Sequence, residues 1–285
     1  MPAGTAPPPE RVPKSLRSRD RTIMRFVSWN INSVRLRLES LKRVSDKLEP
    51  DFLCLQETKA QDPDFPAADI AKIGYPFQCI RGMKGYNGVA ILSRTPISNG
   101  GTRDWCARQD CRHIAADIGE KAELHNFYIP AGGDVPDPTT NKKFAHKLDF
   151  LKEAAAWSRN LPPMGKHILV GDLNIAPHEN DVWSHKQLLK VVSHTPVEVD
   201  LLSKLQISHG WVDAVRAVIP KDEKVFSWWS YRNRTWPGSN RGRRLDHIWV
   251  SPSLAKNVTE AGVFVEARGW QKPSDHVPVW ANIDI

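Results

Sequence analysis

The chain has 285 residues, of which 40 are Lys or Arg and 32 are Asp or Glu, giving a formal net charge of +8. This length suits one α/β domain with a large core. No apolar run reaches the roughly 18 residues that a membrane helix requires, which excludes a spanning protein, and the positive charge favours a polyanionic partner.

The first 23 residues are rich in Pro, Arg and Ser, with five basic and two acidic side chains. Because such a stretch buries too little apolar surface to offset the entropy of ordering, we predict a disordered basic tail over residues 1–23. A single domain is expected over residues 24–285. No secretory signal is recognised, and the four cysteines contain no C-x-x-C pair, so we expect reduced thiols and a cytoplasmic location.

Short apolar runs typical of strands recur along the domain. In chain order, we predict strands at residues 25–31, 51–57, 88–93, 113–118, 123–129, 167–174, 245–251 and 276–285. Apolar residues at helical spacing predict one helix from Val34 to Leu48, stopped by Pro50, and another from Phe144 to Ala155. Strands joined sometimes by helices and sometimes directly favour mixed sheets with helices on their outer faces.

Polar side chains that could carry chemistry gather where these predicted strands end, the usual place for sites in α/β scaffolds. They are Asn30, Glu57, Tyr128, Asp172, Asn174, Asp246, Asp275 and His276. A carboxylate such as Glu57, emerging from an apolar run, must be paired, hydrogen-bonded or metal-bound. A salt bridge at the end of a strand is the structural alternative.

The segment ILVGDLNIAP, residues 168–177, is more informative. Gly171 permits a turn or a close backbone approach, and Asp172 and Asn174 should point the same way because strand side chains repeat every two residues. An acid beside an amide suits an activated water next to an oxyanion. The alternative is that both residues merely form a turn.

A second candidate group follows near the C-terminus, in PSDHVPVW. His276 can act as an acid, a base or a cationic donor to phosphate, and Asp246 is a plausible residue to orient its ring. A purely structural histidine is the competing interpretation.

Residues 224–245 contain six basic side chains and no acid, and the basic side chains are interleaved with Trp228, Trp229, Tyr231 and Trp236. Basic groups contact phosphates and aromatic faces stack on exposed bases, so this pattern predicts a nucleic-acid loop. A solvated charge run above buried aromatic side chains is the alternative.

Taken together and in order, nine segments resemble the exonuclease III family of abasic-site endonucleases, within the superfamily that shares the deoxyribonuclease I fold. The resemblance runs from Arg25 to the C-terminus and rests on SWNIN, LQETK, GYNGVAIL, NFYIPAG, LVGDLNIAP, GWVDAVR, FSWWSYR, NRGRRLD and KPSDHVPVW.

The resemblance implies an α/β fold, a four-layered sandwich of two mixed β-sheets flanked by helices. It implies a Mg²⁺-dependent hydrolase, with Mn²⁺ as a substitute, that cuts the DNA phosphodiester 5′ to abasic sites. Side reactions of the same centre would be 3′-to-5′ exonuclease, 3′-phosphatase or 3′-diesterase activity. The expected partner is double-stranded DNA containing abasic sites or 3′ ends, and a monomer is expected.

On the matched positions, the resemblance makes Glu57 the chief metal ligand, with Asn30 and Asp275 assisting. Asp172 would activate water, Asn174 and His276 would contact the scissile phosphate, and these three belong to the wider set of candidate metal ligands. The remaining implied roles are orientation of His276 by Asp246, contact of Tyr128 with the phosphate, and DNA binding by Arg112, Asn174, Trp228, Arg243, Arg244 and His276.

Ile129, Ala131 and His247 depart from the residues expected of the bacterial exonuclease, which leaves the balance of endonuclease and exonuclease activity open. Two alternatives also remain: a superfamily member acting on a lipid or inositol phosphodiester, and a binding protein that retains the fold without catalysis.

Overall fold

The computed structural model describes residues 23–233 and 235–285. The predicted tail over residues 1–23 lies outside the described residues, except that Ile23 begins the first strand.

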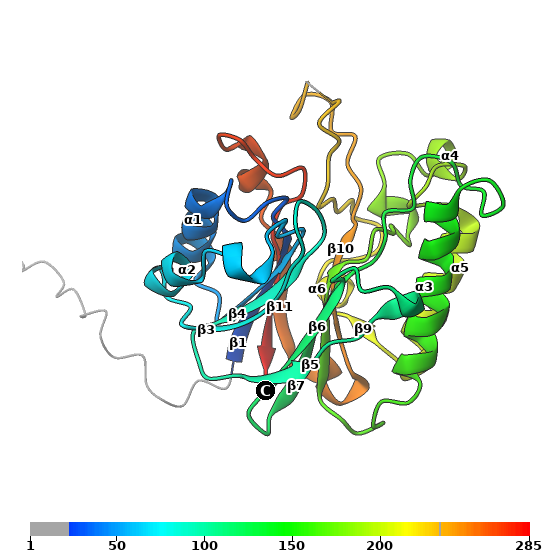
Figure 1. Cartoon of the computed structure of the whole chain (residues 1–285). Coiled ribbons are helices and arrows are strands. Elements are labelled where there is room, and N and C mark those ends of the chain that lie inside the picture. The colour runs from blue at the N-terminus through cyan, green and yellow to red at the C-terminus, as the bar shows by residue number, and fades with distance from the viewer. Residues whose placement is uncertain (1–22, 234) are drawn as a thin grey trace, which may run out of the picture.

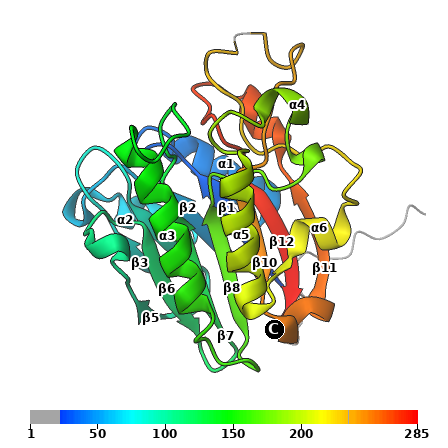
Figure 2. The ribbon, with the colours of Figure 1, turned by 90° about the vertical axis from the view of Figure 1, so that its right-hand side faces the viewer.

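Two six-stranded mixed sheets pack face to face with helices on their outer sides, which confirms the predicted four-layered sandwich (Figure 1). Two long helices, α3 and α5, lie side by side across the second sheet (Figure 2). None of the helices in the described part of the chain is long and apolar enough to cross a membrane. The helices are α1 (Leu38–Leu48), α2 (Ala67–Ile73), α3 (Lys142–Ser158), α4 (His185–Leu188), α5 (Pro196–His209) and α6 (Ala214–Val218).

The first sheet has the order β11-β12-β1-β2-β4-β3. Its central strands β1 and β2 are parallel, and every other pair in it is antiparallel. Its strands are β1 (Ile23–Asn30), β2 (Phe52–Gln56), β3 (Phe77–Arg81), β4 (Val89–Ser93), β11 (Val258–Val263) and β12 (Val279–Asp284).

The second sheet repeats this plan in the order β5-β6-β7-β8-β10-β9. Here β7 and β8 form the parallel pair, and the other pairs are antiparallel. Its strands are β5 (Ser98–Gly101), β6 (His113–Ile118), β7 (Ala122–Tyr128), β8 (His167–Asp172), β9 (Val212–Asp213) and β10 (Asp246–Val250).

Apolar side chains from the central strands fill the space between the sheets. Phe26 and Phe52 stack with ring centroids 4.8 Å apart, and Val170 and Ile248 face them from the second sheet without any exposure. Burial of such side chains contributes about 25 cal/mol per Å² of apolar surface, so the two sheets are held firmly in one relative position. That position sets where the strand ends of one sheet lie against those of the other.

The eight predicted strands and two predicted helices are confirmed, with ends displaced by up to a few residues. The strand expected over residues 167–174 ends at Asp172, and the helix expected from Val34 begins at Leu38. The short strands β3, β5, β9 and β11 and the helices α2, α4, α5 and α6 were not predicted from the sequence.

Candidate active site

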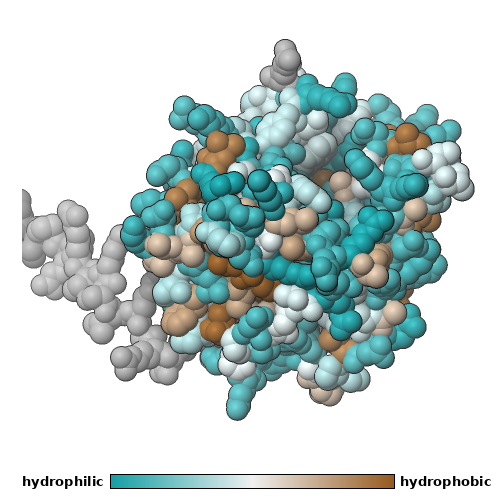
Figure 3. Space-filling model, in the orientation of Figure 1, coloured by the Kyte–Doolittle hydropathy of each residue, from teal (hydrophilic) through white to brown (hydrophobic). Residues whose placement is uncertain are grey.

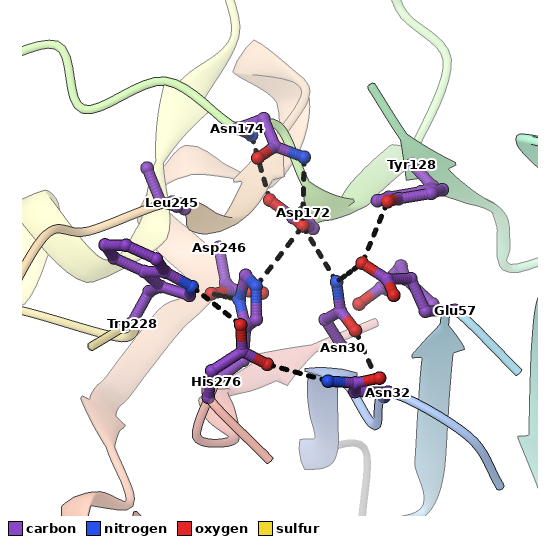
Figure 4. Close-up of polar contacts among 12 residues, drawn as sticks. Asn30, Asn32, Glu57, Tyr128, Asp172, Asn174, Trp228, Leu245, Asp246 and His276 are labelled. Atoms are coloured by element: carbon purple, nitrogen blue, oxygen red, sulfur yellow. Dashed lines mark hydrogen bonds and ion pairs between the residues drawn. The ribbon is translucent and has the colours of Figure 1, made fainter. Parts of the chain in front are cut away.

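The parallel pair at the centre of each sheet brings the polar strand ends together. In the first sheet Asn30 pairs with Gln56, so Glu57 follows directly beside Asn30. Tyr128 pairs with Asp172 in the second sheet. Because carboxyl ends of parallel strands meet at one edge, each sheet presents two candidate residues at the same end of the sandwich (Figure 4).

Asp172 lies at the centre of this group, almost fully buried. Its carboxylate accepts hydrogen bonds from Asn30 Nδ2 at 2.9 Å, from the backbone N–H of Asn174 at 2.9 Å and from Asn174 Nδ2 at 3.1 Å. Burial raises the pKa of Asp172 to about 7, although nearby His276 opposes the shift. A carboxylate with such a pKa can accept a proton near neutral pH.

The side chains of Asp172 and Asn174 do converge, but not because the strand continues. Asn174 has a left-handed φ of 54°, and its backbone N–H closes a turn onto the Asp172 carboxylate. The close backbone approach predicted at Gly171 is also present, since a Cβ there would lie 2.0 Å from the carbonyl oxygen of Phe127. Only glycine can therefore occupy that position.

His276 lies between two aspartates. Its Nδ1 is 2.8 Å from Asp246 Oδ2, and its Nε2 is 3.6 Å from Asp172 Oδ2. Burial would lower the pKa of His276, but Asp246 and Asp172 raise it to about 10, so the imidazole is cationic at neutral pH. Asp246 reaches this place because β10 runs antiparallel to β8 and pairs Asp246 with Asp172.

Glu57 forms the other side of the site. Its Oε1 accepts hydrogen bonds from Asn30 Nδ2 at 2.9 Å and from Tyr128 Oη at 2.8 Å, and its Oε2 pairs with Lys59 Nζ at 2.8 Å. Burial would raise the pKa of Glu57, yet Asn30 and Lys59 hold it below its usual value. Glu57 is therefore ionised at neutral pH and already attracts a cation.

Asp275 completes the acidic groups at this edge. Asn32 Nδ2 donates to its Oδ1 at 3.0 Å, and Trp228 Nε1 donates to its Oδ2 at 3.0 Å. The expected metal ligands Glu57, Asn30 and Asp275 thus offer carboxylate and amide oxygens, the donors that Mg²⁺ prefers, so this set fits a hard divalent cation. Asp172, Asp246 and His276 offer further ligand atoms within 4.8 Å of one another.

These residues form the floor of a groove of about 1030 Å³. Glu57, Tyr128, Asp172, Asn174, Asp275 and His276 line the floor, and its walls include Trp183, Trp228, Arg232, Arg241, Arg243 and Leu245. The guanidinium of Arg243 lies 5.1 Å from the centre of the Trp228 ring. The aromatic and basic residues of the predicted loop therefore border the same groove as the candidate catalytic groups.

Arg112 stands beside Tyr128 rather than in the groove lining. Its guanidinium lies 4.7 Å from the centre of the Tyr128 ring, and its Nε pairs with Asp110 Oδ2 at 2.5 Å. Burial raises the pKa of Tyr128 well above its usual value, so this hydroxyl is a hydrogen-bond donor at neutral pH.

The expectation that Arg244 contacts DNA is wrong. Arg244 is fully buried, with its Nε 2.8 Å and its Nη2 2.9 Å from the Asp181 carboxylate and its Nη1 2.7 Å from Asp213 Oδ2. Both acids lie outside the predicted basic loop. This guanidinium holds the loop to the core and has no surface to offer a phosphate.

Three residues that hold the site together, Asn32, Lys59 and Ser227, were not predicted from the sequence. Lys59 Nζ bridges Glu57 and Asn32, which it contacts at 2.6 Å, and Ser227 Oγ donates to Asp246 Oδ2 at 2.6 Å. Lys59 and Asn32 stand inside the LQETK and SWNIN segments, so their position beside polar strand ends was a usable signal. Ser227 stands inside the FSWWSYR segment, but it does not follow the polar end of a predicted strand, so its contact with Asp246 could not be inferred from its place in the sequence.

Comparison with known proteins gives a consistent result. The sequence profile described as "Endonuclease/Exonuclease/phosphatase family" matches residues 27–276. Exodeoxyribonuclease III of Haemophilus influenzae is 33% identical over 91% of this chain and 99% of its own length.

Solved structures agree. An AP endonuclease from Archaeoglobus fulgidus superimposes with a TM-score of 0.85 at 30% identity, covering 92% of this chain and 100% of that chain. A 3′ phosphatase from Neisseria, bound to a product DNA hairpin, gives a TM-score of 0.83 at 30% identity with the same coverage.

Proposed function

Because the chain belongs to the endonuclease/exonuclease/phosphatase family, in its exonuclease III branch, we propose that it is a Mg²⁺-dependent nuclease that cuts DNA 5′ to abasic sites. Its family makes it a phosphodiester hydrolase of DNA repair. The observation that supports the finer proposal is the position of Asp172 and His276 on the floor of a groove walled by Trp228 and Arg243.

In this proposal Asp172 is the general base. It removes a proton from a water molecule while the water oxygen forms a bond to phosphorus and the bond from phosphorus to the leaving oxygen breaks. Asn30 and Asn174 hold the carboxylate by direct hydrogen bonds, so its free oxygen lone pairs are aimed before DNA binds. The raised pKa of Asp172 places its proton affinity close to the working pH.

His276 and Asn174 would stabilise the negative charge that grows on the phosphate oxygens. The imidazolium of His276 is kept charged and oriented by Asp246, whose carboxylate accepts at Nδ1 and leaves Nε2 facing the groove. Donors that are positioned in advance are worth several kcal/mol in the transition state, about 3–4 for a single one. Tyr128, on the floor beside Glu57, would also contact the phosphate, and its hydroxyl would turn from Glu57 to a phosphate oxygen when Glu57 holds the metal ion.

Glu57, Asn30 and Asp275 would hold the metal ion. When bound, Mg²⁺ would supply positive charge that offsets the negative charge developing on the phosphate oxygens, and Mn²⁺, which also accepts oxygen ligands, would replace it. Lys59 neutralises part of the Glu57 charge in the absence of the ion.

The bound DNA would contact Arg112 and Arg243 through its phosphates, and Trp228 would fill the space beside an abasic sugar. A duplex with a recessed 3′ end or a 3′-phosphate presents the same phosphorus chemistry, so these are further substrates of the proposed site. The large exposed apolar side chains of the described residues are spread along the sequence, and on the face that Figure 3 draws the hydrophobic areas alternate with hydrophilic ones, which supports a monomer. The free thiols suit a reducing, cytoplasmic compartment.

A cleavage assay tests the proposal. Duplexes with an abasic site, a recessed 3′ end, a 3′-phosphate or no lesion are compared in Mg²⁺ with sphingomyelin and an inositol phosphate. We expect the abasic duplex to be cut 5′ to the lesion and the lipid and inositol substrates to remain intact. If only sphingomyelin or the inositol phosphate were hydrolysed, the site would be that of a lipid or inositol phosphodiesterase. If no substrate were hydrolysed, the chain would have a binding role.

Trp228→Ala tests the abasic preference within the same assay. Trp270→Ala is a matched control, since it is also a half-buried tryptophan with an arginine over its ring, 4.3 Å from Arg43, but it does not line the groove. The Trp228 variant should lose discrimination between abasic and intact duplex, and the Trp270 variant should keep it. Equal discrimination in both variants would contradict the role given to Trp228.

A further inference from the structure

A cluster of metal-binding side chains lies at the other end of the strands that carry Tyr128 and Asp172. Glu123 and His125 stand near the start of β7, and His167 begins β8. His167 precedes Asp172 by five residues, so the cluster is about 16 Å from the candidate active site along the strand. The parallel pairing of Glu123 with His167 brings the two strand beginnings together.

Both imidazoles lie close to one carboxylate oxygen. His125 Nε2 lies 3.3 Å and His167 Nδ1 lies 3.1 Å from Glu123 Oε2, and the three ligand atoms all lie within 4.8 Å of one another. A tetrahedral ion with bonds of about 2.0–2.1 Å separates neighbouring ligand atoms by about 3.4 Å. The observed spacing therefore accommodates such an ion with small side-chain movements.

The hydrogen-bonding state of these groups suits a metal. His167 Nδ1 lies within hydrogen-bonding distance of Glu123 Oε2, whereas the buried His125 Nε2 has no hydrogen-bond partner among the described residues. A buried imidazole nitrogen without a partner beside a carboxylate is a candidate metal ligand. His125 Nδ1 lies 3.3 Å from His113 Nε2, the kind of outer contact that fixes the ring of a ligating histidine.

The cluster is also reachable from solvent. Glu123 is 31% exposed in its side chain, whereas His125 and His167 are 3% and 7% exposed. Glu123 and His167 line an open hollow of about 390 Å³. An ion can enter from this side, and the hollow leaves room for a water molecule as the fourth ligand.

We propose that Glu123, His125 and His167 bind a zinc-like first-row transition-metal ion, separate from the Mg²⁺ of the catalytic site. Two nitrogen donors favour Zn²⁺ or Co²⁺ over Mg²⁺, which prefers oxygen. The ion ties the beginnings of β7 and β8 together and stabilises the folded chain, because the unfolded chain does not hold these three residues in place.

The test uses the full chain, freed of metal with a chelator and then titrated with Co²⁺ in excess Mg²⁺. Bound Co²⁺ is detected by its visible absorption, and Zn²⁺ is added separately while the melting temperature is recorded. Variants Glu123→Gln and His167→Asn remove one ligand each. His146→Asn is the matched control, since His146 is equally buried but lies on α3 outside the cluster.

We expect the unmodified chain and His146→Asn to bind one equivalent of Co²⁺ and to melt at a higher temperature with Zn²⁺. Glu123→Gln and His167→Asn should bind Co²⁺ about 100-fold more weakly and show no Zn²⁺-dependent rise. Retention of the absorption in His276→Asn separates this site from the catalytic carboxylates. No Co²⁺ absorption in the unmodified chain, equal binding by Glu123→Gln, or loss of the signal in His276→Asn would overturn the proposal.

Discussion

The ammonium of Lys147 donates a hydrogen bond to the main-chain oxygen of Asn174, 2.8 Å away, from inside the protein. Lys147 belongs to α3 and is fully buried, and its charge is matched by Glu198 of α5, which it contacts at 2.5 Å. The helices of the outer layer thus hold the turn that presents Asn174 to the groove.

Lys147→Met should destabilise the fold by about 3–5 kcal/mol, because it leaves the Glu198 carboxylate buried without its partner. It should also lower kcat by releasing the Asn174 turn. Denaturant unfolding and single-turnover rates measure the two effects. The double variant Lys147→Met/Glu198→Gln should recover part of the lost stability but not the lost rate. The control is Lys152→Met, which breaks an exposed ion pair on the same helix and should lower the free energy of unfolding by less than about 1 kcal/mol. Equal costs for the two lysine variants would contradict the importance of the buried pair.

Glu57→Gln should raise the Mg²⁺ concentration needed for half-maximal rate by about 10- to 100-fold, because the side chain keeps its shape but loses the charge that holds the cation. Saturating Mn²⁺ should restore part of the rate. Rates measured across Mg²⁺ and Mn²⁺ titrations check this, with exposed Glu120→Gln as a control that keeps the original metal requirement. An unchanged requirement would remove Glu57 from the ligand set.

Asp172→Asn should lower kcat by roughly 10²- to 10⁴-fold at any metal concentration, because the lost function is proton removal from water. DNA affinity should hold or tighten, since a negative charge beside the phosphate has gone. The same metal titrations and a binding assay without turnover measure both. If saturating metal ion restored the rate of Asp172→Asn as completely as it restored that of Glu57→Gln, an arrangement in which both acids ligate metal ions would be favoured.

The pH profile of kcat/KM should be bell-shaped. Activity requires ionised Asp172, so it should rise as the pH increases through about 7, and it requires protonated His276, so it should fall as the pH passes about 10. A bound divalent cation shifts both limbs to lower pH. Asp246→Asn removes a charge that raises the pKa of His276 and should move the alkaline limb further down.

Ser227→Ala is the matched control for that profile, because it removes the hydrogen bond to Asp246 but leaves its charge. Its alkaline limb should stay close to that of the unmodified chain. If the limb of Asp246→Asn did not move either, His276 would not be the group that titrates there.

Arg243→Ala and Arg244→Ala should differ although the residues are adjacent. The first should raise the KM for DNA and reduce the salt dependence of binding by about one unit of slope, with little loss of stability. The second should cost about 3–5 kcal/mol of stability, because Asp181 and Asp213 would remain buried without their shared guanidinium. Salt-dependent binding and denaturant unfolding distinguish them, and similar unfolding midpoints would contradict the buried role of Arg244.

The different directions of the Arg243 and Arg244 side chains could not be predicted from the sequence. The backbones of Trp228 and Arg243 form an antiparallel β-bridge, so the chain is extended at Arg243. In an extended segment, neighbouring side chains point to opposite sides. One arginine therefore faces the groove and the other the core. The run of basic residues carried no sign of which was which, because the acids that receive Arg244 are distant in sequence.

The strand ends themselves were predictable because long apolar runs stop at polar residues, as before Glu57 and Asp172. Their meeting point was not, since Asp246 reaches Asp172 only through the pairing of β10 with β8. For α5 the sequence did contain a usable signal, a capping box from Thr195 to Glu198 and a terminal Gly210. The edge strand β5, in contrast, has the sequence Ser-Asn-Gly-Gly and no apolar pattern.

Asn30 and Glu57 belong to one sheet and Tyr128 and Asp172 to the other, so neither half of the sandwich contains a complete site. A newly synthesised chain whose sheets have not docked, or a molecule opened by heat, lacks this alignment, so we expect it not to hydrolyse phosphodiesters. Catalytic activity therefore depends on the packing of the two sheets against each other and is lost when they separate. A nuclease built in this way cannot be active before its fold is complete.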